Sequence, residues 1–133
     1  MMSRPRILVV DDDEPLLRLM KNILSQFHFE PLVASSGPQA LEMARIEVPD
    51  LILIDKNMPG MSGEDVIRQF KADPLFDQIP ILVLSGEPLS PRELAALGVH
   101  GSVQKPFDLT KLIAEIRHRL PQAASKEPAT ASL

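Results

Sequence analysis

Short runs of consecutive apolar residues alternate along the chain with longer segments in which apolar residues recur at helical spacing. Three runs are entirely apolar, at residues 7–10, 51–54 and 81–84. Runs of this length that end at turn-forming residues are typical of strands buried on both faces. Weaker runs at 31–35 and 101–104 predict two further short strands.

Each predicted strand is followed by a segment with the periodicity of an amphipathic helix. The apolar face of the first is Leu16, Leu17, Met20, Ile23, Leu24 and Phe27. The five helices are expected to start at Asp13, Ser36, Ser62 or Gly63, Ser90 and Asp108. The fourth helix is short, because a capping box at 90–93 is followed by a stop at Gly98. The last helix is expected to turn Leu109, Leu112, Ile113, Ile116 and Leu120 inward.

This alternation, strand then helix five times, predicts an α/β domain with a parallel sheet and right-handed crossovers. With 133 residues, 44% of them hydrophobic, the chain has the length and apolar content for one domain with one sizeable core. We assign residues 4–120 to this domain. The Pro-, Ala- and Ser-rich residues 121–133 are expected to form a disordered tail.

The composition argues against several functional classes. A net charge of −4 gives no sign of a nucleic-acid or membrane surface. The chain has no cysteine, which excludes disulfides, thiolate metal sites and cysteine nucleophiles and suits a reducing compartment. It has neither an apolar run of about 20 residues nor the apolar segment of a signal peptide. We expect a cytoplasmic protein without membrane insertion.

Polar side chains stand at the ends of the predicted strands: Asp11–Asp13, Ser35–Ser36, Asp55, Ser85 and Lys105. In an open parallel sheet, ligands bind outside the carboxyl ends of the strands, near the switch in strand order. The second strand ends without a charged residue, which suits the edge of the sheet. These observations predict the order 2-1-3-4-5, with the acids on both sides of the switch.

Carboxylates gathered at one place repel each other unless a cation lies among them. Oxygen ligands with a net negative charge favour Mg²⁺ in the cell. Asp55 is then a metal ligand only, or also a nucleophile that attacks phosphorus and forms an acyl phosphate. The Lys105 ammonium and the Ser85 hydroxyl are suited to hold the phosphoryl oxygens.

These residues resemble the receiver domains of two-component response regulators. The matching motifs, in chain order, are Ile-Leu-Val-Val-Asp-Asp at 7–12, Pro-Asp-Leu-Ile-Leu-Ile-Asp at 49–55, Met-Pro-Gly-Met-Ser-Gly at 58–63 and Lys-Pro-Phe at 105–107. The resemblance covers about residues 4–120. It implies a flavodoxin-like doubly wound sheet and a phosphoacceptor switch, phosphorylated by a sensor histidine kinase or a phosphotransfer protein.

The resemblance also implies a role for each site residue. Asp55 would be the phosphoacceptor, and Ser85 and Lys105 would bind its phosphoryl group. Mg²⁺ would be held by Asp12, Asp55 and the backbone carbonyl of Asn57, with Asp11 acting through a bound water. The Lys105–Pro106 peptide bond would be cis, a form that is largely confined to bonds preceding proline.

The resemblance bears on the phosphorylated state as well. Asn57 and Glu87 occupy the positions that tune phosphate loss, and this pair resembles rapidly dephosphorylated chemotaxis-type regulators. We expect a lifetime of seconds to minutes. Ser102 stands at the switch position, where the family usually has Tyr or Phe, and the stretch from Ser85 to Lys105 is about two residues shorter than usual. Aromatic–hydroxyl switching is therefore not expected in its usual form.

The expected protein is a stand-alone receiver without an output domain or direct nucleic-acid contact, acting on a downstream protein target. It would be no enzyme beyond its own phosphorylation and dephosphorylation. One alternative is an adaptor that binds partners independently of phosphorylation. Another is a phosphatase of the haloacid dehalogenase type, because residues 11–13 contain Asp-x-Asp. We expect Lys56 to be solvated, and His28, His100 and His118 to have no functional role.

Overall fold

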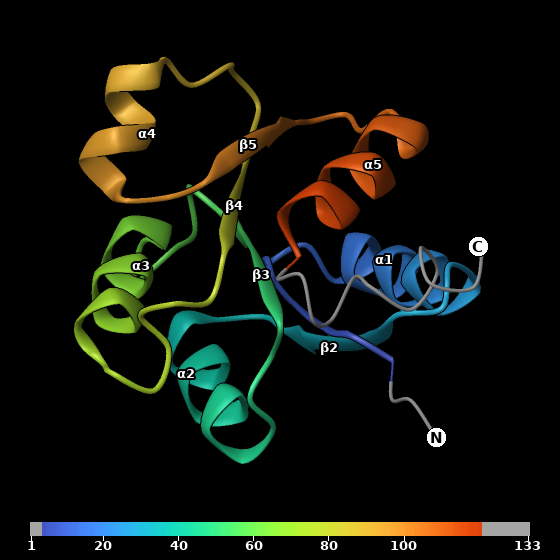
Figure 1. Ribbon diagram of the computed structural model, residues 1–133, viewed down its shortest axis with the longest axis horizontal. Helices are drawn as coiled ribbons and strands as arrows, with labels where there is room; N and C mark the ends of the chain where they lie inside the picture. Colours follow the sequence, from blue (N-terminus) through green and yellow to red (C-terminus); the bar gives the residue numbers. More distant parts are fainter. Residues whose placement is uncertain (1–3, 121–133) are drawn as a thin grey trace, which may run out of the picture.

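Five parallel strands form the centre of the protein in a computed structural model, which describes residues 4–120 (Figure 1). The strands are β1 (Arg6–Val10), β2 (Glu30–Ala34), β3 (Leu51–Asp55), β4 (Ile81–Ser85) and β5 (Gly101–Gln104). Their order is β2-β1-β3-β4-β5. The predicted fold class and strand order are therefore confirmed, whereas the tail predicted for 121–133 lies outside the described residues.

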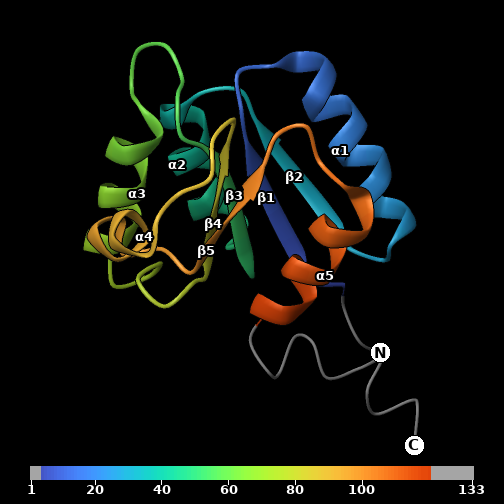
Figure 2. The same ribbon diagram turned by 90° about the horizontal axis from the view of Figure 1, so that it is seen from above.

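Five helices cover the two faces of the sheet. They are α1 (Glu14–Gln26), α2 (Gly37–Ile46), α3 (Gly63–Ala72), α4 (Pro91–Leu97) and α5 (Leu109–Arg119). Helices α1 and α5 lie on one face, and α2, α3 and α4 lie on the other (Figure 2). Each helix is preceded by a cap residue whose side chain accepts a hydrogen bond from the backbone N–H three residues later. These caps are the predicted Asp13, Ser36, Ser62, Ser90 and Asp108.

The three fully apolar runs are the buried centre of the sheet. Every residue of 7–10, 51–54 and 81–84 has no exposed surface. Alternate side chains of these strands pack against α1 and α5 on one face and against α2 and α3 on the other. The polar residues after the central strands gather at the carboxyl ends of the strands, where Asp11, Asp55 and Ser85 are still largely buried.

Two details of the predicted elements are wrong. Strand β2 lies one residue earlier than 31–35, because Glu30 pairs with Arg6 and the N–H of Ser35 donates to the Gln39 side chain at 2.7 Å. Leu109 does not face the core and is 41% exposed. As the first residue of α5 it lies at the rim of the domain, where Leu109 and Leu19 line a groove of about 350 Å³.

None of the helices built from residues 4–120 combines the length and the hydropathy that crossing a membrane requires.

Candidate functional site

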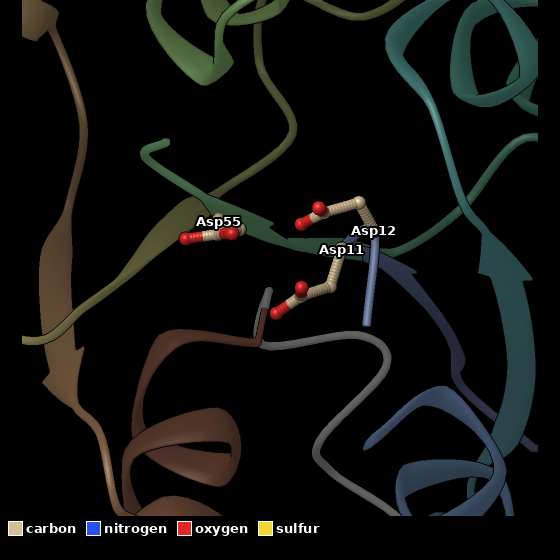
Figure 3. A group of neighbouring side chains, drawn as sticks. All are labelled: Asp11, Asp12 and Asp55. Atoms are coloured by element: carbon tan, nitrogen blue, oxygen red, sulfur yellow. The ribbon is translucent and has the colours of Figure 1, made fainter. Parts of the chain in front are cut away.

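The carboxyl ends of β1 and β3 bring three acidic side chains together. Asp11 and Asp12 follow β1, and both point toward Asp55 at the end of β3 (Figure 3). One carboxylate oxygen from each residue lies within 4.8 Å of the other two. Asp11 has no exposed surface and Asp55 is 8% exposed, whereas Asp12 is exposed. The predicted acidic cluster is therefore formed.

Lys105 completes the cluster from the loop after β5, at the same edge of the sheet. Its backbone N–H donates to the carbonyl of Ser85 at 2.8 Å, which fixes the loop after β5 against the end of β4. Its Nζ lies 2.6 Å from Oδ2 of Asp11 and 3.7 Å from Oδ1 of Asp55. Burial lowers the pKa of Lys105, but the hydrogen bond and the charges of Asp11 and Asp55 outweigh it and raise the pKa above its ordinary value. The bond between Lys105 and Pro106 is cis, as the resemblance implied.

The charge balance at this edge favours a cation. Burial raises the pKa of Asp55, and the negative charge of Asp11 raises it further against the opposing effect of Lys105. Three carboxylates thus meet here, and the Lys105 ammonium pairs with two of them, Asp11 and Asp55. The backbone N–H of Asn57 donates to Oδ1 of Asp55 at 3.4 Å, so the chain bends around this carboxylate. A site with several carboxylate oxygens and excess negative charge fits a hard divalent ion such as Mg²⁺.

A second group of predicted residues lines a cavity of about 340 Å³. Asn57, Ser85 and Glu87 contribute to its wall. Ser85 is 5% exposed, and its Oγ accepts the backbone N–H of Glu87 at 3.2 Å. Ser102 does not line this cavity. It pairs with Val83 across the β4–β5 register and lines a separate groove of about 770 Å³ beside α5.

Two residues near Asp55 were not anticipated as part of the site. Lys56 is not fully solvated: its side chain is 28% exposed, and its Nζ lies 3.8 Å from Oε2 of Glu93. Gly63 packs tightly, since an added Cβ would overlap the carbonyl oxygen of Asp55 and lie 3.0 Å from Cα of Lys56. The capping box in the sequence identified Glu93 as a residue of the helix start. It did not identify Lys56 as its ion-pair partner, because Lys56 lies on a distant segment. Gly63 ends the motif at 58–63 and lies at a helix start, but neither feature indicated its close contact with the backbone of Asp55 and Lys56.

Asp13 does not join the acidic cluster. Its Oδ1 accepts the backbone N–H of Leu16 at 3.1 Å, so it caps α1 as predicted. Its own N–H donates to Asp11 at 3.1 Å, which helps to hold that buried carboxylate in place.

Comparison with known proteins agrees with this geometry. The model of the response regulator receiver domain family matches residues 7–117. The chain is 33% identical over 127 residues to the hybrid signal transduction histidine kinase D of Dictyostelium discoideum. That alignment covers 94% of this chain and 8% of the kinase. It is 39% identical over 114 residues to the response regulator PleD of Caulobacter vibrioides. That alignment covers 84% of this chain and 25% of PleD. The chain thus spans a small part of these two relatives.

Among solved structures, the chemotaxis protein CheY4 of Vibrio cholerae is similar, with a TM-score of 0.83 and 29% identity. That likeness covers 89% of this chain and 100% of the other. The family match, the strand order and the residues gathered at the strand ends all agree. This chain belongs to the receiver domain family of two-component response regulators.

Proposed function

We propose that the chain is the phosphoacceptor switch of a two-component phosphorelay and that Asp55 is the residue phosphorylated. Receiver domains of response regulators are phosphorylated by histidine kinases, and the family assignment supports this role. The observation that carries the proposal is the meeting of Asp55 with Asp11, Asp12 and Lys105 at one edge of the sheet.

The proposed reaction is a transfer of one phosphoryl group from a phosphohistidine to Asp55. A carboxylate oxygen of Asp55 forms a bond to phosphorus while the phosphorus–nitrogen bond of the donor breaks. The electron pair of that bond stays with the imidazole nitrogen, which takes up a proton. The product on this chain is an acyl phosphate. With its Nζ 3.7 Å from Asp55, the Lys105 ammonium is well placed to pair with the transferred oxygens.

Asp11, Asp12, Asp55 and the backbone carbonyl of Asn57 are the groups that would hold Mg²⁺, with Asp11 acting through water. When bound, this ion neutralises charge on the phosphoryl oxygens as the group is transferred. The resting cluster supports the assignment, because its acids exceed its cations and the pKa of Asp55 is raised by burial and by its acidic neighbours.

The chemistry proposed for the chain is limited to its own phosphorylation and dephosphorylation, and its signal would pass to a separate protein target. The phosphatase alternative needs the second acid of Asp-x-Asp as a proton donor. Asp13 instead caps α1 through a hydrogen bond to Leu16, which argues against that role. An adaptor that acts without phosphorylation remains the competing function.

Labelling with acetyl phosphate and Mg²⁺, followed by intact-protein mass measurement, tests the proposal. The wild-type chain should gain one phosphoryl group, and both Asp55→Asn and chelation of the metal should abolish the gain. Asp65→Asn, at an exposed acid on α3, is the matched control and should label as the wild type does. Labelling of Asp55→Asn at the wild-type rate would overturn the assignment. A wild-type chain that never labels would favour the adaptor.

A further inference from the structure

An ion pair links the acceptor strand to α4. Lys56 directly follows Asp55, and Glu93 is the third residue of α4. Their Nζ and Oε2 atoms lie 3.8 Å apart. Both side chains line the cavity of about 340 Å³ that also contains Ser85 and Asn57. This pair is therefore a direct contact between the acceptor region and the fourth helix.

The backbone of Lys56 is held firmly. Its N–H donates to the carbonyl of Leu84 at 3.0 Å, and its own carbonyl accepts the N–H of Gly63 at 3.1 Å. Gly63 packs against the backbone of Asp55 and Lys56 too closely to admit a side chain. Any response of Lys56 to new charge nearby must therefore come from its side chain, which is long and flexible.

Helix α4 is held less firmly than the other helices. It has seven residues and none of them is buried. Its first turn is ordered by a capping box, in which Oε1 of Glu93 accepts the N–H of Ser90 at 3.0 Å. The other carboxylate oxygen of Glu93 faces Lys56. With so little apolar burial in α4, the ion pair carries a larger share of its attachment.

We propose that the Lys56–Glu93 pair holds α4 in the unphosphorylated state and weakens when Asp55 is phosphorylated. The inference rests on the function proposed above. An acyl phosphate carries a charge of roughly −1.5 to −2, where the Asp55 carboxylate carried a single negative charge, so phosphorylation increases the negative charge near Lys56. The ammonium of Lys56 then divides its interaction between that group and Glu93. A population shift of α4 requires an interaction whose strength differs between the two states, and the ion pair supplies that difference. This mechanism needs no aromatic residue at position 102, where the chain has a serine.

Hydrogen exchange of the backbone amides of 92–97 tests the link in the full chain, since Pro91 has no N–H. Glu93→Gln removes the charge but keeps an oxygen for the cap, and Lys56→Met removes the partner without touching the cap. Each variant should speed exchange in α4 by about twofold to fivefold, the usual strength of a partly exposed ion pair. The double variant should match the single variants, because all three lack the same contact. Beryllofluoride with Mg²⁺ should speed exchange in the wild type and add little in the variants.

Asp65→Asn is the matched control, since Asp65 is the acidic third residue of α3 and pairs with Arg68 at 2.7 Å. It should leave exchange in α4 unchanged. The link is refuted if Lys56→Met exchanges as the wild type does, or if the effects of the single variants add in the double variant. Acetyl phosphate labelling is measured on the same samples. If the wild type is labelled but exchange in α4 is the same in the wild type and the variants, the link alone is refuted. If the wild type is not labelled, the proposed function is refuted.

Discussion

The ammonium of Lys105 lies 2.6 Å from a carboxylate oxygen of Asp11, a residue with no exposed surface. The two residues are 94 positions apart in the chain. Their pairing joins the loop after β5 to the end of β1, across the strand end that carries Asp55. A charge-assisted hydrogen bond of this length both fixes the lysine and compensates a buried charge.

Replacing Lys105 should therefore destabilise the fold as well as impair labelling. Lys105→Met leaves Asp11 buried without its cation, and the free energy of unfolding should fall by about 1–3 kcal/mol. Urea unfolding at neutral pH measures the change. Lys111→Met, at an exposed lysine of α5, is the matched control and should stay close to the wild type. Equal stability of the two variants would contradict a compensating role for Lys105.

Removing the charge of Asp55 should have the opposite effect on stability. Burial and the charge of Asp11 both disfavour its carboxylate, as its raised pKa indicates. Asp55→Asn keeps the shape and relieves the repulsion, so the free energy of unfolding without metal should rise by about 1 kcal/mol. Thermal unfolding should also show that Mg²⁺ stabilises the wild type more than this variant. An equal response of both proteins to Mg²⁺ would argue against Asp55 as a ligand.

Gly63→Ala should damage the site through the backbone. Its Cβ would overlap the carbonyl of Asp55, so either α3 or the end of β3 must shift. Overpacking of this kind destabilises by about 1–3 kcal/mol, and labelling by acetyl phosphate should slow severalfold. Gly86→Ala is the control, because a Cβ there meets no atom within 4 Å. Normal labelling of Gly63→Ala would show that the site tolerates a shift of α3.

Much of the fold and the gathering of the site could be predicted from local pattern. Runs such as 51–54 are apolar because both faces of the strand are covered, and strand ends meet because the sheet is parallel. The Lys56–Glu93 pair could not be predicted, since it depends on where α4 lies relative to β3 and on two flexible side chains. Leu109 was misplaced for a related reason: helical periodicity gives a face, but not the point at which the helix leaves the core.

The lifetime of the phosphorylated form should be seconds to minutes. Asn57 and Glu87 are both exposed and line the same cavity as Ser85, which leaves a path for water to the acceptor. Loss of label from phosphorylated protein in the presence of Mg²⁺, followed by mass measurement, gives the rate. Asn57→Ala and Glu87→Ala should change this rate more than Asp65→Asn does. A wild-type lifetime of many hours would contradict the assignment of these two residues.

His100 should make the fold less stable in mild acid. The N–H of Ile81 donates to its Nδ1 at 3.2 Å, which requires that this nitrogen carry no proton. Burial lowers the pKa of His100, and the positive charges of Lys71 on α3 and Arg119 on α5 lower it further. The unfolded chain therefore binds this proton at a higher pH than the folded chain does.

The sign of the effect follows from proton linkage. Above the ordinary histidine pKa of about 6.5, His100 is neutral in both states and contributes no pH dependence. As the pH falls below that value, the unfolded state takes up the proton first, so the free energy of unfolding decreases until the folded pKa is reached. His100→Asn keeps an acceptor for Ile81 without the titration, and its urea midpoint should fall less steeply over this range. Lys71→Gln, which removes one opposing charge, should give an intermediate slope. Identical slopes in wild type and His100→Asn would show that the histidine does not couple folding to pH.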